Sequence, residues 1–211
     1  MKDTTIIGGS DGPTSVFVVG RNHKPSMKQR MQRAMFRLRK KWHALWIKPN
    51  PHTMGETANY IREKYDFVEL PRDSKKYQRL YNEHRCSFII QYEPHLLGDY
   101  ATPPELKGKS QEDVKEFLDK LQLQQEKASQ VPEELFPLEY YYFEKQEKDI
   151  HMELQLEARF GHIGGGASGK SISKFYKIEK DVYKYYGVSE DDIKNHTKRY
   201  DNLLRCLASR H

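Results

Sequence analysis

A helical repeat of apolar residues between two prolines is the feature that most restricts how this chain can fold. Between Pro25 and Pro49, large apolar residues recur at intervals of three and four, which keeps them on one side of an α-helix for about five turns. They are Met27, Met31, Met35, Leu38, Trp42, Leu45 and Trp46, with Ala34 beside them. Ser26 is a suitable N-cap, and Pro49 ends the pattern. The pattern predicts a long amphipathic helix whose apolar stripe belongs to a core.

This helix lies in a segment that has no acidic residue. From Gly12 to Gly55 the chain carries ten lysines and arginines and no aspartate or glutamate. The net charge of the 211 residues is only +6, so the rest of the chain is slightly acidic. A basic charge confined to one segment indicates an anionic partner at one surface.

Six cations of the helix are the predicted nucleic-acid contacts: Arg30, Arg33, Arg37, Arg39, Lys40 and Lys41. Four of them (Arg30, Arg33, Arg37 and Lys40) recur at spacings of three and four, so we expect them on one face. Such a row can follow phosphates without reading bases. An anionic membrane, suggested by the tryptophans beside lysines, and an acidic protein groove, suggested by the methionines, are the alternatives. Nucleic acid, or a protein that carries it, ranks first because the apolar stripe has a simpler use in a core.

The chain as a whole predicts an α+β fold, with several helices packed on a small antiparallel sheet. Residues 1–20 predict a β-hairpin, 21–50 the basic helix, and 51–211 an α+β body with a loop at 93–109. Within the body the helices are expected at 53–64, 73–84, 110–131, 171–186 and 189–208. The strands are expected at 67–70, 86–92, 138–143 and 150–158, and a glycine-rich turn at 161–166. Alternation of apolar and polar residues at 150–158 predicts a half-buried strand antiparallel to 138–143.

Residues 164–171 match the phosphate-binding P-loop pattern, and the candidate residues are Gly164, Gly169, Lys170 and Ser171. Backbone N–H groups of such a loop point at a phosphate, and the lysine reaches the outer phosphates. A P-loop-like nucleotide-binding protein is therefore an alternative function. The strand before the motif alternates, however, whereas a P-loop strand is continuously apolar. A simple anion-binding turn and a plain flexible turn also remain open.

No other motif names a reaction. Cys86 and Cys206 have no metal-type spacing, and the nine histidines show no His-x-x-x-His or His-Glu-x-x-His pattern. We expect no catalytic residue, no metal and no cofactor, and a binding protein rather than an enzyme. Base stacking on the tyrosine-rich residues 140–143 is a further alternative. No apolar run approaches the roughly 20 residues of a membrane span, and the N-terminus lacks a secretory pattern. We therefore expect a cytoplasmic protein.

Two resemblances add to these predictions. The segment Gly8-Gly9-Ser10-Asp11-Gly12-Pro13-Thr14 resembles the Gly-Gly-Ala-Asp-Gly-Pro-Thr segment of the membrane β subunit of sodium-translocating decarboxylases. Because this chain has no membrane span, Asp11 is not expected to inherit that subunit's role in sodium coupling. The whole chain is similar to short, charged proteins of phages and mobile elements, some of which are anti-CRISPR inhibitors. That resemblance implies occlusion of a host defence nuclease, such as a Cas nuclease with its guide RNA, in the cytoplasm of a bacterial host.

Overall fold

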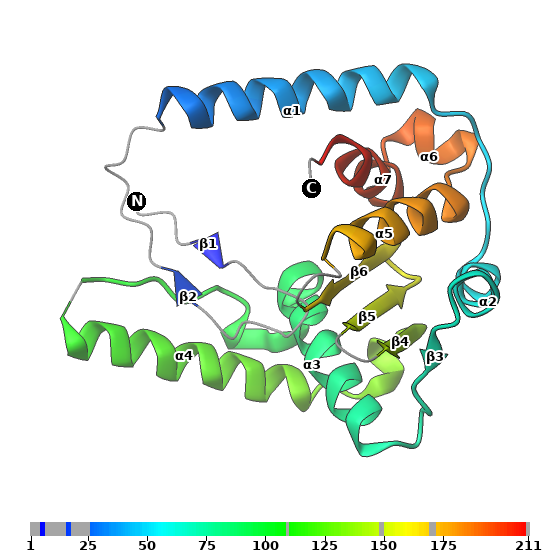
Figure 1. Ribbon diagram of the computed structural model, residues 1–211. Coiled ribbons are helices and arrows are strands. Elements are labelled where there is room, and N and C mark those ends of the chain that lie inside the picture. The colour runs from blue at the N-terminus through cyan, green and yellow to red at the C-terminus, as the bar shows by residue number, and fades with distance from the viewer. Residues whose placement is uncertain are drawn as a thin grey trace. The chain divides into compact units, whose positions relative to one another are not determined.

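The computed structural model describes residues 5–6, 16–17, 26–108, 110–147, 150–168 and 172–209. The chain divides into two compact units, whose helices and strands are labelled in Figure 1. One unit consists of Lys24–Pro71 and Glu139–His211, and the other contains Arg72–Leu138 with a short N-terminal hairpin. The described residues form helices, one four-stranded antiparallel sheet and a separate two-stranded hairpin, which confirms the predicted α+β class. No described helix is both long and apolar enough to cross a membrane.

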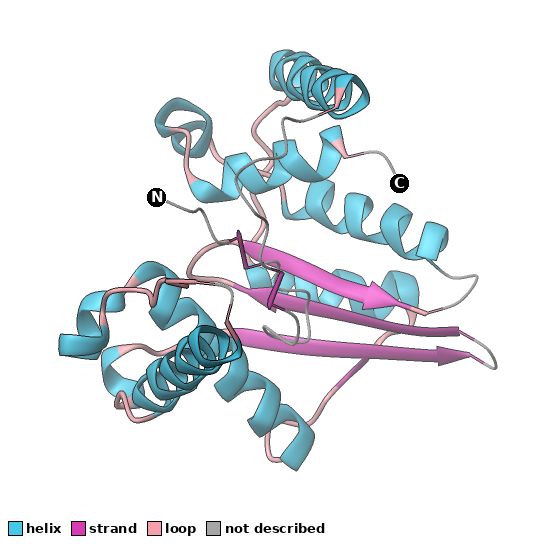
Figure 2. Cartoon of the chain, turned by 90° about the vertical axis from the view of Figure 1, so that its left-hand side faces the viewer, coloured by secondary structure: helices cyan, strands magenta, loops and turns pink. Residues whose placement is uncertain are grey.

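The four-stranded sheet belongs entirely to the first unit. Its order is β3 (Val68–Glu69), β4 (Tyr140–Glu147), β5 (Ile150–Glu157) and β6 (His162–Ala167), and every neighbouring pair is antiparallel. Figure 2 shows the three long strands side by side. The predicted antiparallel pairing of the strands expected at 138–143 and 150–158 is confirmed.

One face of this sheet forms the main core. Successive strand residues point to opposite faces, so Met152, Leu154 and Leu156 of β5 share one face, and all three are fully buried. They pack in one cluster with apolar residues of α2 (Met54–Tyr65), α5 (Ile172–Tyr186) and α7 (Lys198–Ala208). The intervening polar residues of β5 therefore lie on the opposite face.

The prediction of a glycine-rich turn at 161–166 is wrong beyond its first residue. Gly161, with φ of 61°, belongs to the turn, but β6 begins at His162 and pairs with β5 as far as Ala167. A Cβ at Gly165 would collide with the carbonyl oxygen of Glu153 and lie 2.9 Å from Cζ of Phe175. Glycine is needed here because the backbone of β5 and the Phe175 ring of α5 leave no room for a side chain, a reason that a turn-like composition does not reveal.

The C-terminal helices differ in one respect from the prediction. The helix expected at 171–186 is α5, which ends before Gly187 at φ of 59°. The single helix expected at 189–208 is instead divided into α6 (Glu190–Asn195) and α7. The backbone of His196 has a left-handed conformation, which ends α6, and Thr197 caps α7. Ser189 and Asp192 form a capping box at the start of α6.

In the second unit, one helix replaces the predicted helix and strand. α3 runs without a break from Lys75 to Tyr92, so the strand expected at 86–92 is wrong. A short apolar run does not distinguish a strand from a buried helix. Buried Arg85 donates hydrogen bonds to the carbonyl oxygens of Val131, Pro132 and Phe136, which ties the middle of α3 to the chain beyond α4.

The rest of this unit follows the predictions more closely. A 3-10 segment, η1 (Pro94–Tyr100), lies in the region expected as a loop, and α4 (Gln111–Ser129) is capped by Ser110, the first residue of the expected helix. A second 3-10 segment, η2 (Glu133–Leu135), follows α4. In the N-terminal hairpin, β1 (Thr5–Ile6) pairs antiparallel with β2 (Val16–Phe17). The decarboxylase-like segment at 8–14 lies outside the described residues.

Candidate binding surface on helix α1

Helix α1 spans Met27–Trp46, and both of its ends agree with the sequence (Figure 1). The Ser26 hydroxyl accepts a hydrogen bond from the Gln29 backbone N–H, while the Gln29 side chain accepts one from the Ser26 N–H. This reciprocal capping box satisfies N–H groups that the first turn leaves without helical partners. Ile47 then leaves the helix in an extended conformation, two residues before Pro49.

One face of α1 contacts α7. Lys40 forms an ion pair with Asp201, and the Arg39 guanidinium donates to the carbonyl oxygen of Ala208 at 3.5 Å. His43 lies on the same face, where burial and then Lys180 and Lys184 lower the pKa of its imidazole. Further along, Ala44 and Ile47 pack against the main core. The contacts that hold α1 thus come mainly from its second half.

The apolar stripe of α1 lies on a different face and is exposed, so its predicted place in a core is wrong. No residue of α1 is buried. The exposed fractions of seven large side chains lie between 43% and 83%, and they are Met27, Met31, Met35, Leu38, Trp42, Leu45 and Trp46. α7 covers the more polar face instead, because Lys40, Arg39 and His43 find specific partners there. The periodicity identified an apolar face, but not what covers it.

The six predicted nucleic-acid contacts fall into two groups. Arg39 and Lys40 are bound to α7, whereas Arg30, Arg33, Arg37 and Lys41 are exposed. Within the described residues, these four cations make no ion pair, and Arg37 only donates to the carbonyl oxygen of Arg33. Their spacing places them in a row along one flank of the apolar stripe. We call this set the basic row; Lys41 takes the place that the prediction gave to Lys40.

A groove lies beside the first half of α1. It has a volume of about 840 Å³, and α1 forms it together with the C-terminal end of α7. Its apolar lining includes Met31, Met35, Phe36 and Ala208, and its arginines are Arg33, Arg37 and Arg39. The groove thus combines an apolar lining with guanidinium groups, which favours a partner that has both apolar and negatively charged groups.

The P-loop candidates are only partly described. Gly164 lies inside β6, where it pairs with Gln155, whereas Gly169, Lys170 and Ser171 lie outside the described residues. β6 is antiparallel to its neighbour β5, whereas the strand before a phosphate-binding P-loop belongs to a parallel sheet. Because the first residues of the motif are committed to this ladder, we base no function on it.

The tyrosine-rich strand offers little surface for base stacking, because Tyr140, Tyr142 and Phe143 are buried. The sequence reasoning missed a different group on the same sheet, formed by Glu144, His151 and Glu153. Its signal was present in the alternation of β5, whose polar residues share one face. The third residue, Glu144, joins them through the register of β4 with β5, which sequence spacing alone does not reveal.

Comparison with known proteins does not assign this surface to a protein family. The chain matches no protein-family model, no curated protein and no solved structure. The resemblances to a decarboxylase segment and to anti-CRISPR proteins therefore stay predictions. The assignment of a function depends on the surface of α1 itself.

Proposed function

We propose that this protein is a non-catalytic binding protein that docks through α1 on a negatively charged protein surface. One observation carries the proposal: α1 exposes a stripe of seven large apolar side chains directly beside the basic row. The sequence alone ranks nucleic acid first among the anionic partners, because it predicts that the stripe lies in a core. Since the stripe is exposed, a partner has to cover apolar area as well as neutralise charge.

The apolar stripe favours a protein groove. Folded proteins rarely expose large contiguous apolar patches unless the patch binds something. Side chains at intervals of three, four and seven are the anchors by which an amphipathic helix enters an apolar groove. Met27, Met31 and Met35 suit such a contact because the unbranched thioether side chain adapts to an irregular surface.

The basic row favours acidic groups along one rim of that groove. Three of its four residues are arginines, whose planar guanidinium groups make paired hydrogen bonds to carboxylates. Among the exposed cations of α1, the four of the row lie on one flank of the stripe and Lys28 lies on the other, whereas a flat anionic membrane would be met best by equal numbers on both flanks. Opposite charge across the interface also speeds association, and added salt weakens that effect.

The test is site-specific photo-crosslinking of the full-length protein in extract, followed by binding measurements on the captured protein. The reactive residue is placed at Leu38, and at Leu135 as control, because their exposed fractions are 60% and 59%. We expect a partner captured only from Leu38 whose purified form binds less tightly to each of two variants. One replaces the basic row with glutamine, and the other replaces Met31, Leu38 and Trp42 with glutamine. A captured protein that is insensitive to both variants would contradict the proposal.

A nucleoprotein complex is the second candidate, because three of the four cations in the basic row are arginines, which also bind phosphate bidentately. It retains the sequence-based expectation of a phage-type inhibitor that occludes a host nuclease. Fluorescence anisotropy with labelled duplex DNA, single-stranded DNA and RNA tests direct binding. A slope of log affinity against log salt that flattens in the basic-row variant supports it. If the variant with glutamine at Met31, Leu38 and Trp42 binds nucleic acid as tightly as the wild type, nucleic acid is favoured over the protein groove. If the protein binds anionic vesicles alone, a membrane is favoured.

A further inference from the structure

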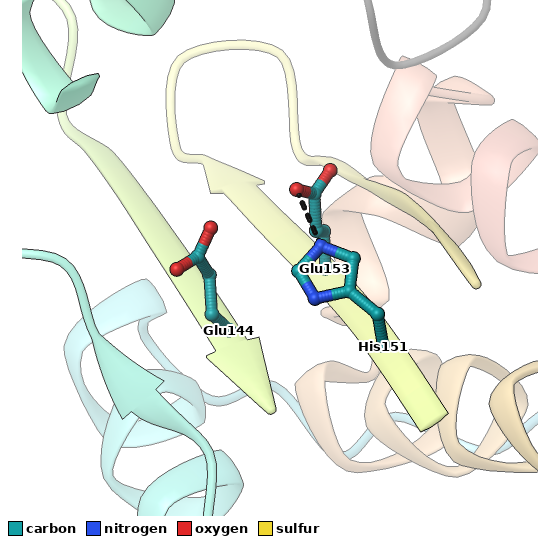
Figure 3. Close-up of side chains that lie close together, drawn as sticks. All are labelled: Glu144, His151 and Glu153. Atoms are coloured by element: carbon teal, nitrogen blue, oxygen red, sulfur yellow. Dashed lines mark hydrogen bonds and ion pairs between the residues drawn. The ribbon is translucent and has the colours of Figure 1, made fainter. Parts of the chain in front are cut away.

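A second group of side chains lies on the sheet, on the face opposite the main core. Glu144 of β4 stands directly across from Glu153 of β5, and His151 precedes Glu153 by two residues. Residues two apart on a strand point to the same face, so all three side chains meet there. Figure 3 shows the imidazole of His151 next to the Glu153 carboxylate, with their contact drawn, and the Glu144 carboxylate on the neighbouring strand.

The spacing of the ligand atoms suits one small cation. One nitrogen or oxygen from each residue lies within 4.8 Å of the others. Nε2 of His151 and Oε1 of Glu153 are 2.9 Å apart. Bonds of about 2.0–2.2 Å to one metal ion place neighbouring ligand atoms roughly 3–4 Å apart, so only small side-chain rotations are required. The exposed fractions of the His151 and Glu153 side chains are 41% and 21%, which leaves room for water.

The set of donor atoms favours a cation at this position. Two carboxylates stand directly across from each other on β4 and β5, and an imidazole lies beside them. A divalent ion would bind both carboxylates and take the neutral imidazole as its third ligand. The phenol of buried Tyr142 also forms a hydrogen bond with Glu153, and such an outer contact orients a metal ligand.

We propose that Glu144, His151 and Glu153 form a binding site for a divalent transition-metal ion, with Zn²⁺ preferred and Mn²⁺ weaker. One imidazole and two carboxylates match these ions better than Ca²⁺ or Mg²⁺, which prefer oxygen ligands. Three protein ligands leave at least one coordination position for water or a ligand, as in reactive rather than purely structural zinc sites. Two adjacent strands hold the three ligands, so the backbone of the sheet fixes their spacing.

The experiment is calorimetric titration of metal-free, full-length protein without a histidine tag with ZnCl₂ and then MnCl₂. We expect one Zn²⁺ per chain, and each of Glu144→Gln, His151→Gln and Glu153→Gln should weaken binding by more than about a hundredfold. Tyr142→Phe should weaken it by about tenfold. His95→Gln is the matched control, because His95 also contacts a glutamate, Glu93, at 3.4 Å but belongs to no three-residue cluster within the described residues.

Two further readouts separate a metal site from a loss of folding. Circular dichroism of each variant without metal should match the wild type, and Zn²⁺ should raise the melting temperature of the wild type but not of His151→Gln. Co²⁺ added in place of Zn²⁺ should give visible absorption bands that the His151→Gln variant lacks. Absence of saturable binding in the wild type would overturn the proposal. An equal weakening of Zn²⁺ binding in His95→Gln and in His151→Gln, relative to the wild type, would also overturn it.

Discussion

Helices α1 and α5 have the same kind of sequence pattern and opposite surroundings. Both repeat large apolar residues at intervals of three and four. In α5, Phe175, Ile178 and Val182 are buried against the sheet, whereas α1 buries none of its residues. The difference shows that a helical repeat of apolar residues defines an apolar face but does not determine what covers that face. In α5 the cover is the sheet, and in α1 we propose that it is a partner protein.

The strongest test of this difference is to replace one aromatic residue on each helix with alanine. Phe175→Ala should lower the free energy of unfolding by about 3–5 kcal/mol, because it leaves a cavity between α5 and β6. Trp42→Ala should change it by less than about 0.5 kcal/mol, because that side chain is 58% exposed. Urea denaturation followed by far-ultraviolet circular dichroism measures both. A comparable loss in the two variants would show that the stripe of α1 is covered within the chain.

A second prediction uses Glu179, a partly buried carboxyl group on α5. Burial raises the pKa of Glu179 to about 7, although Lys180 acts in the opposite direction. The folded state then holds a proton that the unfolded state has released, so stability should fall as the pH rises from 4.5 to 7. Glu179→Gln should remove this fall and raise the stability above pH 7 by about 1–3 kcal/mol. Denaturation across this range measures it, and a gain of equal size at every pH would contradict the assignment to Glu179.

The smallest expected effect concerns the contact that holds α1 on α7. Burial alone would raise the pKa of Asp201, but hydrogen bonds from Lys40 and Arg205 outweigh it and lower that pKa. The stabilisation is therefore present above pH 3.8 and is lost as the pH falls through the lower folded-state pKa. Lys40→Ala should cost less than about 1 kcal/mol, because both partners are partly exposed.

The matched control for this contact is Arg205→Ala, which removes the other cation on Asp201 but leaves the pair between α1 and α7 in place. Hydrogen exchange of the α1 amides should quicken in Lys40→Ala and stay unchanged in Arg205→Ala. Equal exchange in all three proteins would show that Lys40 does not hold the helix on α7.

Local signals predicted the elements well where a cap and a repeat agreed. The starts of α1, α4 and α6 follow from Ser26, Ser110 and Ser189, each with a partner side chain three residues later. One error is the single helix expected at 189–208, which is interrupted at His196, and two others lie where composition was the only guide. The apolar residues 86–92 continue α3, and the glycines at 164–166 belong to β6, because contacts distant in sequence decided both cases.

The candidate sites were predictable to different degrees. The basic row follows from the spacing of arginines on one helix, apart from the exchange of Lys40 for Lys41. The groove beside it required the end of α7, which lies about 170 residues further along the chain. Glu144, His151 and Glu153 meet only through the register of β4 with β5, and one residue of slip would turn a strand's side chains to the other face.

The sequence by itself determined the α+β class, the long helix between Pro25 and Pro49, the antiparallel pair of strands and the concentration of positive charge in one segment. These properties depend on local periodicity, capping and composition. Only the tertiary structure decided which face of α1 is covered, which cations are bound to α7 and which polar side chains of the sheet meet. Those outcomes depend on contacts between residues far apart in sequence, because burial and charge pairing are set by what lies opposite a residue.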